Sequence, residues 1–230
     1  MNNNQEIIKI LKRFNINYSN LQLYREAFAH SSFTNEHKEL KINNYDRLEF
    51  LGDSVLGLLT SEYLFNKHSN MSAGELSFYR SKVIRKEFLS ELSKKFGYGK
   101  ATLLGNGNSK SKISPSIYED IFESFIGALY LDLGINQVRN FLKQNFFNEV
   151  EKVNLENLKD NKTKLQEFLQ AEKKKPVIYK LIKENKSEKN RIIFEVEAIV
   201  DGITLGKGKG KTKKEAEQIA AEEAYNKMVK

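Results

Sequence analysis

Residues 45–59 read Tyr-Asp-Arg-Leu-Glu-Phe-Leu-Gly-Asp-Ser-Val-Leu-Gly-Leu-Leu and form the most informative stretch of the chain. Apolar side chains cover most of the circumference that this stretch would have as a helix, which is typical of a helix packed on several sides. The acidic residues in it are therefore unusual. Asp46, Glu49 and Asp53 stand at positions i, i+3 and i+7, so a helix places all three on one face over two turns.

A second stretch, residues 117–131, repeats the arrangement and also predicts a buried helix. Asp120 and Glu123 lie on one face of it. Gly127 continues that face, and a glycine there allows another helix to approach closely. Together the two stretches predict a pair of apolar helices whose carboxylates converge.

Such carboxylates are costly in the interior of a protein. Each costs several kcal/mol unless it is protonated, paired or bound to a cation. Arg47 and nearby lysines could pair with one or two of them, but four or more acids from two helices suit a hard divalent ion that prefers oxygen ligands. We expect Mg²⁺, with Mn²⁺ as a substitute. Taken singly, acids on helices are usually solvated surface residues, and Asp46 could merely interact with the helix dipole after an Asn44 cap.

Three further polar residues can be explained by hydrogen bonds at helix ends. Ser72 and Glu75 have the spacing of a capping box, which explains Glu75 without catalysis, although a catalytic role stays open. Ser116 and Glu119 have the same spacing, and there we favour capping. For His30, which is followed by two serines, we expect a hydrogen-bonded place at a helix end.

Composition limits the remaining chemistry. The 230 residues suffice for two domains, and the net charge of +8 favours a polyanionic partner. Cysteine is absent and only three histidines occur, so any metal site must use oxygen ligands. No apolar run is long enough to span a membrane and the N-terminus lacks the apolar core of a signal peptide, so we expect a cytosolic protein.

The hydrophobic periodicity divides the chain into a helical part, a linker and an α+β part. Residues 1–150 are predicted to be all-helical, with polar loops at 34–44, 67–70 and 105–116, and residues 151–161 form the expected linker. Residues 162–230 predict a small α+β domain in the order αβββα, with helices over 162–172 and from Thr212 onward, and strands near 177–184, 190–200 and 203–207. This order implies an antiparallel three-stranded sheet with both helices on one face.

Basic residues outnumber acidic ones after residue 160, with clusters at 173–175 and 207–214. The second cluster predicts a flexible loop of alternating glycine and lysine, followed by a helix capped by Thr212. Lysines and backbone amides at a helix N-terminus attract phosphate.

The sequence Asp46-Arg-Leu-Glu-Phe-Leu-Gly-Asp53 closely resembles the signature of the ribonuclease III family. Further segments follow in the family's order: Ala27-Phe-Ala-His30-Ser31, Gly74-Glu75-Leu-Ser77-Phe-Tyr-Arg80 and Asp120-Ile-Phe-Glu123-Ser-Phe-Ile-Gly127. The resemblance implies that the magnesium ligands are Glu49, Asp53, Asp120 and Glu123. Of these, Asp53 and Glu123 would be catalytic, and Asp46 and Glu75 would support them. Arg80 would help to bind the RNA backbone.

Two departures from the family's pattern matter. Asp46 stands where the family more often has Glu, and its side chain is shorter than the one that makes the dimer-edge or substrate contact there. The loop at 105–116 lacks the paired glycines and the arginine that are common there and that would engage the RNA backbone.

Residues 162–169, Lys-Thr-Lys-Leu-Gln-Glu-Phe-Leu, and the basic segment before the last helix resemble a double-stranded-RNA-binding domain. Such domains recognise the shape of A-form RNA through its minor groove and phosphates. The resemblance places Gln166 and Glu167 at one minor groove and the loop 184–190 at the next. It implies that Lys211, Lys213 and Lys214 contact the RNA phosphates.

The expected function is that of a magnesium-dependent endoribonuclease that cleaves double-stranded RNA to 5′-phosphate and 3′-hydroxyl ends. Its expected substrates are ribosomal RNA precursors and other structured transcripts, including messenger and transfer RNA. The family cuts both strands as a homodimer, and Phe50, Leu51, Phe122 and Phe125 are interface candidates that could equally be core. The alternatives are a non-catalytic double-stranded-RNA-binding protein and a structural ribosome-associated protein that uses the helical domain for docking.

Overall fold

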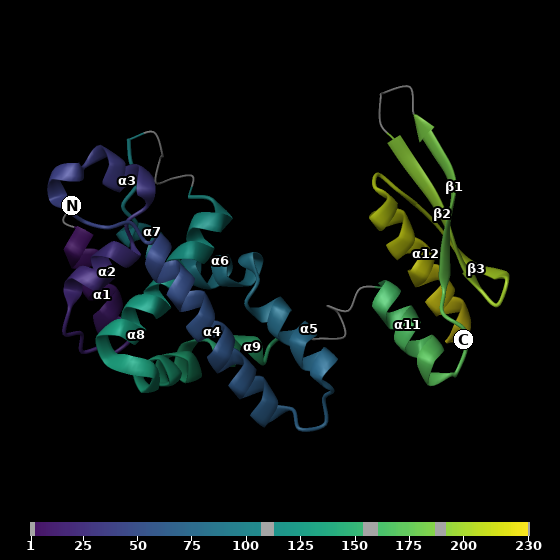
Figure 1. Cartoon of the computed structure of the whole chain (residues 1–230), viewed down its shortest axis with the longest axis horizontal. Helices are drawn as coiled ribbons and strands as arrows, with labels where there is room; N and C mark the ends of the chain where they lie inside the picture. The colour runs from purple at the N-terminus through teal and green to yellow at the C-terminus, as the bar shows by residue number, and fades with distance from the viewer. Residues whose placement is uncertain (1–2, 107–112, 154–160, 187–191, 230) are drawn as a thin grey trace. The chain divides into compact units, whose positions relative to one another are not determined.

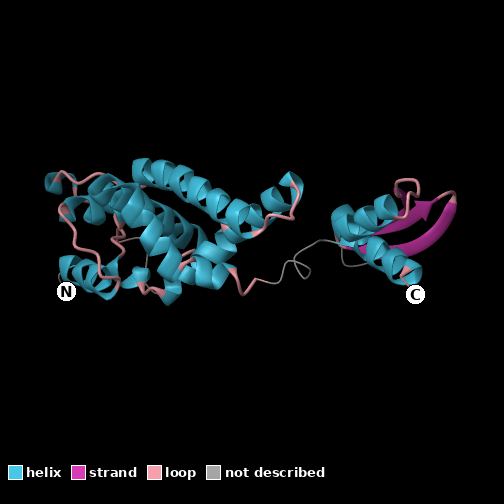
Figure 2. Ribbon diagram, turned by 90° about the horizontal axis from the view of Figure 1, so that it is seen from below, coloured by secondary structure: helices cyan, strands magenta, loops and turns pink. Residues whose placement is uncertain are grey.

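The computed structural model describes residues 3–106, 113–153, 161–186 and 192–229. The chain separates into two compact units, residues 1–153 and residues 154–230. The first unit is helical and the second contains a sheet (Figure 2). The predicted linker at 151–161 falls largely outside the described residues, so its bounds stay a prediction. No helix in the described part of the chain is long and apolar enough to cross a membrane.

The first unit confirms the helical prediction. Its elements (Figure 1) are α1 Asn3–Arg13, α2 Leu21–Ala27, α3 Ser31–Glu36, the 3₁₀ helix η1 Lys38–Leu40, α4 Asp46–Lys67, α5 Ala73–Val83, α6 Lys86–Lys95, α7 Tyr98–Ala101, α8 Pro115–Asn145 and α9 Phe147–Val150. Within the described ranges, strand-like pairing in this unit is limited to a single bridge between Ala29 and Leu103.

Helices α4 and α8 pack against each other along the centre of this unit, and two glycines make this possible. A Cβ atom on Gly52 would lie 1.7 Å from the carbonyl oxygen of Glu123, and one on Gly127 would lie 2.2 Å from that of Leu48. The predicted close approach at Gly127 is therefore confirmed. Its counterpart Gly52 completes the contact.

The apolar side of α8 forms the core of the first unit. Phe122 and Phe125 are fully buried there among other aromatic rings, among them Tyr98 and Phe146. They are core residues and not interface residues, because no surface remains on them for a partner. Phe50, in contrast, is 78% exposed.

The prediction for the start of α8 was wrong in detail. Ser114 is the cap, since its side chain accepts a hydrogen bond from the amide of Ile117 at 3.3 Å, and Pro115 is the first helical residue. Proline fits that position because its missing N–H would have no helical partner there. Ser116 and Glu119 therefore form no capping box.

The second unit confirms the αβββα order. It comprises α11 Asn161–Ala171, β1 Ile178–Lys186, β2 Ile192–Val200, β3 Ile203–Gly210 and α12 Lys213–Met228. The strands are antiparallel in the order β1-β2-β3. The core lies between the sheet and the helices and consists of Leu165, Leu169, Val196, Ala198, Val200, Ala216, Ala220, Ala221 and Ala224.

The prediction of a flexible loop after residue 206 was wrong. Residues 203–210 form strand β3, and its alternate glycines face α12: a Cβ atom on Gly206 would lie 2.0 Å from the carbonyl oxygen of Ala220, and one on Gly208 would lie 2.0 Å from that of Ala216. The glycines therefore allow a strand and an alanine-faced helix to pack closely. The predicted cap of α12 is confirmed, because the Thr212 side chain accepts from the amide of Glu215.

Candidate active site

The pairing of α4 with α8 brings Glu49 and Glu123 into the same partly buried region. Glu123 is only 8% exposed. Burial, followed by the negative charges of Asp53, Glu119, Glu49 and Asp120, raises its pKa to about 8. Burial and the charges of Asp120, Asp46, Glu119 and Asp53 raise the pKa of Glu49 to about 7. The charges of Asp53 and Asp120 thus act on both glutamates.

Asp120 accepts a hydrogen bond from a buried tyrosine. The hydroxyl of buried Tyr45, the residue before α4, donates to Asp120 Oδ2 at 3.0 Å. Burial raises the pKa of Asp120, and this hydrogen bond, Lys86 and His30 oppose the shift. His30 itself caps α3, where its Nδ1 accepts from the amide of Ser32, which confirms its expected place at a helix end.

Glu119 is a fifth carboxylate at this site, although its spacing from Ser116 predicts a capping role. It contributes to the raised pKa values of both Glu49 and Glu123, and burial raises its own. Lys86 lies 3.7 Å from it. The spacing of Glu119 and Glu123, four residues apart on one helix, was the signal that could have found it.

The two supporting acids differ in position. Asp46 lies at the start of α4, is exposed, and accepts a hydrogen bond from the Asn44 side chain at 2.8 Å. Its charge contributes to the raised pKa of Glu49. Glu75 lies on α5, where it completes a capping box with Ser72. It is not among the carboxylates that most strongly raise the pKa values of Glu49 and Glu123.

The donor set fits a hard divalent cation, since Glu49, Asp120 and Glu123 are partly or largely buried carboxylates and Asp53 lies exposed one turn further along α4 from Glu49. Among the described residues, no three His, Asp or Glu side chains stand close enough as they are to bind one ion.

Arg80 lies on α5, where its Nη1 donates to Ser61 Oγ of α4 at 2.9 Å. It is exposed and lines a groove of ≈ 500 Å³ between α4 and α5. The hydrogen bond orients the guanidinium at this surface.

Four of the residues predicted to contact RNA in the second unit lie on its helices. Gln166 and Glu167 are exposed on α11, Lys213 and Lys214 are exposed in the first turn of α12, and Lys211 precedes it. Of the predicted loop at 184–190, residues 184–186 belong to β1 and the others are outside the described residues. Lys207 and Lys209, the other two lysines of the cluster at 207–214, lie on β3. They form ion pairs of 2.8 Å with Glu197 and Glu195 of β2.

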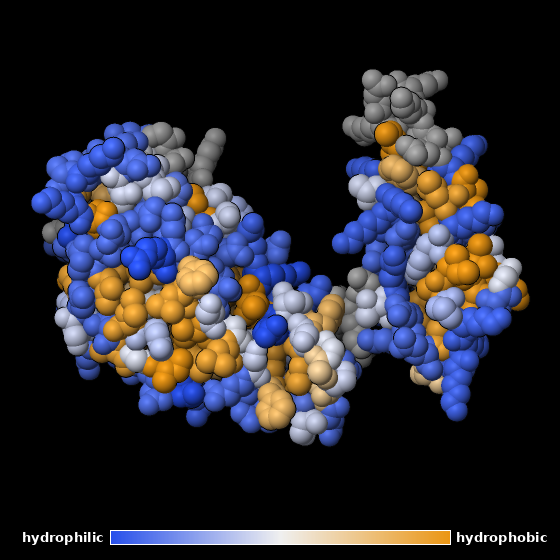
Figure 3. All heavy atoms as spheres, in the orientation of Figure 1, coloured by the Kyte–Doolittle hydropathy of each residue, from blue (hydrophilic) through white to orange (hydrophobic). Residues whose placement is uncertain are grey.

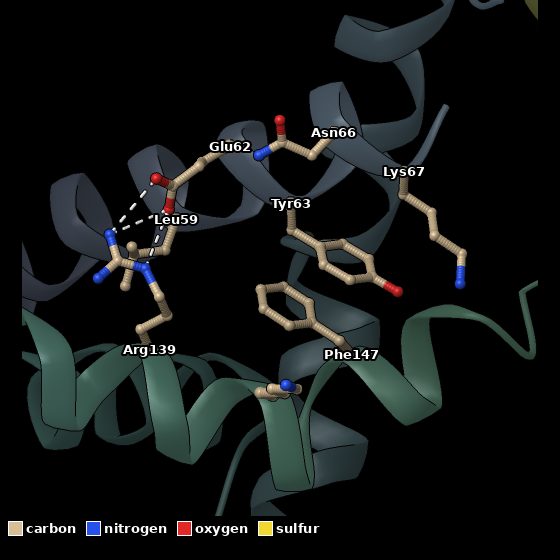
Figure 4. Close-up of a pocket in the computed structure, with 8 residues that line it drawn as sticks. Leu59, Glu62, Tyr63, Asn66, Lys67, Arg139 and Phe147 are labelled. Atoms are coloured by element: carbon tan, nitrogen blue, oxygen red, sulfur yellow. Dashed lines mark hydrogen bonds and ion pairs between the residues drawn. The ribbon is translucent and has the colours of Figure 1, made fainter. Parts of the chain in front are cut away.

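Beyond the carboxylates, a second set of contacts fastens α4 to the end of α8 (Figure 4). Tyr63 stacks on Phe147 of α9 with ring centroids 3.9 Å apart, and Glu62 pairs with Arg139 of α8 at 3.2 Å. These residues line a pocket of ≈ 440 Å³. These contacts hold the C-terminal half of α4 against α8 and α9. Together with the close approach at Gly52 and Gly127, they set the position of the helix that carries Glu49.

Comparisons with known proteins agree with this architecture. Residues 20–150 match the family described as Ribonuclease-III-like, and residues 161–228 match the double-stranded RNA binding motif. Ribonuclease 3 from Streptococcus pyogenes serotype M2 (strain MGAS10270) is 46% identical over 213 residues, 92% of this chain and 92% of that protein. Ribonuclease 3 from Staphylococcus aureus (strain bovine RF122 / ET3-1) is 43% identical over 213 residues, 92% of this chain and 87% of that protein.

Among solved structures, the nuclease domain of ribonuclease III from Campylobacter jejuni is 30% identical with a TM-score of 0.53, and the match covers 61% of this chain and 98% of that one. That structure is described as showing flexibility in the region involved in dimer formation. With a matching nuclease domain, a matching RNA-binding motif and relatives similar over nearly their whole length, the chain belongs to the ribonuclease III family.

Proposed function

We propose that this protein is a magnesium-dependent endoribonuclease that cleaves double-stranded RNA to 5′-phosphate and 3′-hydroxyl ends. The observation that carries the proposal is the convergence of carboxylates from α4 and α8, which raises the pKa values of Glu49 and Glu123 to about 7 and about 8. Strongly shifted groups at a partly buried site are typical of catalytic centres.

Glu49, Asp53, Asp120 and Glu123 would hold Mg²⁺, with Mn²⁺ as a substitute. Members of the family generally depend on a metal ion. Such an ion, when bound, makes water a better nucleophile and stabilises the charge that builds on the phosphate and on the departing 3′ oxygen. The carboxylates would hold the ion in place, and the packing of α4 on α8 shields Glu123 from water.

The second unit would supply most of the affinity for RNA. Its exposed lysines at the start of α12 combine positive charge with the amides of a helix N-terminus, which suits phosphate. Gln166 and Glu167 on α11 would reach the minor groove, because recognition of A-form RNA relies on shape and on 2′-hydroxyl contacts. Substrates of this kind include ribosomal, messenger and transfer RNA precursors in the cytoplasm.

A homodimer follows from the same reading, because cutting both strands of a duplex calls for two sites. Phe50 is exposed at a groove of ≈ 600 Å³ that Leu51 and Leu131 also line. Leu58 and Phe65, further along α4, are exposed as well, and apolar patches gather on the face of this unit seen in Figure 3. Exposed apolar surface of this extent is typical of a protein–protein interface.

The main alternative is a double-stranded-RNA-binding protein that keeps the fold without cutting. That reading expects lost carboxylates, whereas all four are present in this chain. A structural ribosome-associated protein would not depend on a metal at all.

The deciding experiment is cleavage of an end-labelled RNA hairpin by the full chain with Mg²⁺, Mn²⁺, Ca²⁺ or EDTA. We expect cleavage with Mg²⁺ and Mn²⁺, and 5′-phosphate ends that a 5′-phosphate-dependent exonuclease can degrade. Binding without cleavage under every divalent ion would instead support the non-catalytic alternative.

A further inference from the structure

Two buried tyrosines of the first unit make the same kind of contact with α8. The hydroxyl of Tyr45 donates to Asp120 Oδ2 at 3.0 Å, and the hydroxyl of Tyr24 donates to Asp132 Oδ2 at 3.0 Å. Asp132 also accepts from the amides of Ser19 and Asn20, so that contact fixes the start of α2. Asp120, in contrast, belongs to the carboxylate group described above. The Tyr45 contact therefore reaches into the candidate metal site.

The position of Tyr45 is fixed from several sides. Its amide donates to the carbonyl of Ala29 at 2.9 Å, its side chain is only 3% exposed, and its ring lies edge-on to that of His30 with centroids 5.8 Å apart. A ring held in this way cannot follow a moving carboxylate. The hydroxyl therefore keeps its position and orients the carboxylate of Asp120 through the hydrogen bond.

The contact occupies one oxygen of Asp120 and leaves the other available. Among the described residues, no other hydrogen bond to Asp120 is formed. A hydroxyl donor suits this place better than a lysine or an arginine, because it orients the carboxylate without adding a positive charge that would repel a cation. Carboxylates that bind metal ions are commonly held by such outer hydrogen bonds.

We propose that Tyr45 is a positioning residue of the metal site, whose hydroxyl holds one oxygen of Asp120 so that the other binds the divalent cation. The inference rests on the proposed function, since it assigns Asp120 to the metal. It adds a residue that lies outside the four carboxylates and acts only through one of them.

The test compares Tyr45→Phe with Tyr24→Phe in the full chain. Each variant removes one buried hydroxyl that donates to an aspartate of α8, so Tyr24→Phe controls for the general cost of losing such a contact. Binding of Mn²⁺ alone is measured by electron paramagnetic resonance, and folding by circular dichroism. Cleavage is then followed as a function of Mg²⁺ concentration, and RNA affinity is measured with Ca²⁺.

We expect Tyr45→Phe to weaken Mn²⁺ binding about tenfold or more and to raise the half-saturating Mg²⁺ concentration by a similar factor. Cleavage at saturating Mg²⁺ and RNA affinity should stay near those of the unaltered chain, and Tyr24→Phe should leave all metal measurements unchanged. Equal Mn²⁺ affinities in the two variants would overturn the inference while leaving the proposed function intact. An unaltered chain that neither binds Mn²⁺ nor cleaves RNA would overturn both.

Discussion

At the scale of single residues, Glu49 and Glu123 are held where their charged forms are disfavoured. Glu123 is the more extreme, because it is nearly buried and four other carboxylates act on it. The sequence predicted this environment from acids within apolar helices. It did not predict Glu119, because its Ser-x-x-Glu spacing favoured a cap and only the position of Ser114 in the fold excludes that role.

In the metal-free protein, the raised pKa values of Glu49 and Glu123 make the folding stability depend on pH. Folded-state pKa values of about 7 and about 8, against an ordinary 4.5, mean that the folded chain binds more protons than the unfolded chain between these limits. Stability must therefore fall as the pH rises from about 5 to about 8. Thermal melts in EDTA should show a falling Tm over this range, and Glu123→Gln should reduce the slope.

A Tm that rises over this range, or an unchanged slope in Glu123→Gln, would contradict the account. Addition of Mg²⁺ at pH 7 provides the complementary measurement. It should raise the Tm of the unaltered chain more than that of Glu123→Gln, because a cation relieves the repulsion among the carboxylates.

At the scale of elements, the α4–α8 contact depends on two glycines at their crossing. Gly52→Ala should destabilise the first unit by about 3 kcal/mol or more, because the added Cβ meets the backbone of Glu123. Gly57→Ala on the same helix is the matched control, since no atom lies within 4 Å of its Cβ position. It should stabilise the helix by up to about 1 kcal/mol. Urea unfolding measures both, and equal effects would refute the proposed role of Gly52.

The lysines of the last strand and the last helix should also behave differently. Lys213→Ala/Lys214→Ala removes exposed charges at a helix N-terminus, so RNA binding should weaken and the slope of log affinity against log salt should drop by about 1 to 2. Lys207→Ala/Lys209→Ala removes lysines of β3 that form ion pairs with Glu197 and Glu195 of the neighbouring strand β2. Fluorescence anisotropy with a labelled duplex should show little change there. Equal losses of RNA affinity in the two double variants would contradict the assignment of phosphate binding to the first turn of α12.

The same strand shows where sequence reasoning fails. Alternating glycine and lysine between residues 206 and 211 predicts a loop, because glycine weakens isolated strands. The structure has a strand because Gly206 and Gly208 pack on the alanines of α12, a contact between segments that local patterns do not reveal. Helices, in contrast, were predicted well because their apolar periodicity is local.

At the scale of the whole molecule, the expected homodimer rests on Phe50. Phe50→Glu should shift the chain toward monomers in sedimentation velocity, because a charge in a desolvated interface is costly. Ile178→Glu, at an exposed apolar position of the second unit, is the control and should leave assembly unchanged. A monomeric unaltered chain, or a Phe50→Glu variant that still dimerises, would refute this interface.

We propose that the carboxylates of α4 and α8 hold the metal ion on which RNA cleavage depends. Single-turnover cleavage of a labelled RNA hairpin at saturating Mg²⁺, with Glu123→Gln compared against Glu91→Gln at an exposed position of α6, tests it most directly. We predict that Glu123→Gln slows cleavage by about 10²- to 10³-fold with unchanged RNA affinity, while Glu91→Gln cleaves normally. Undiminished cleavage by Glu123→Gln would contradict the account.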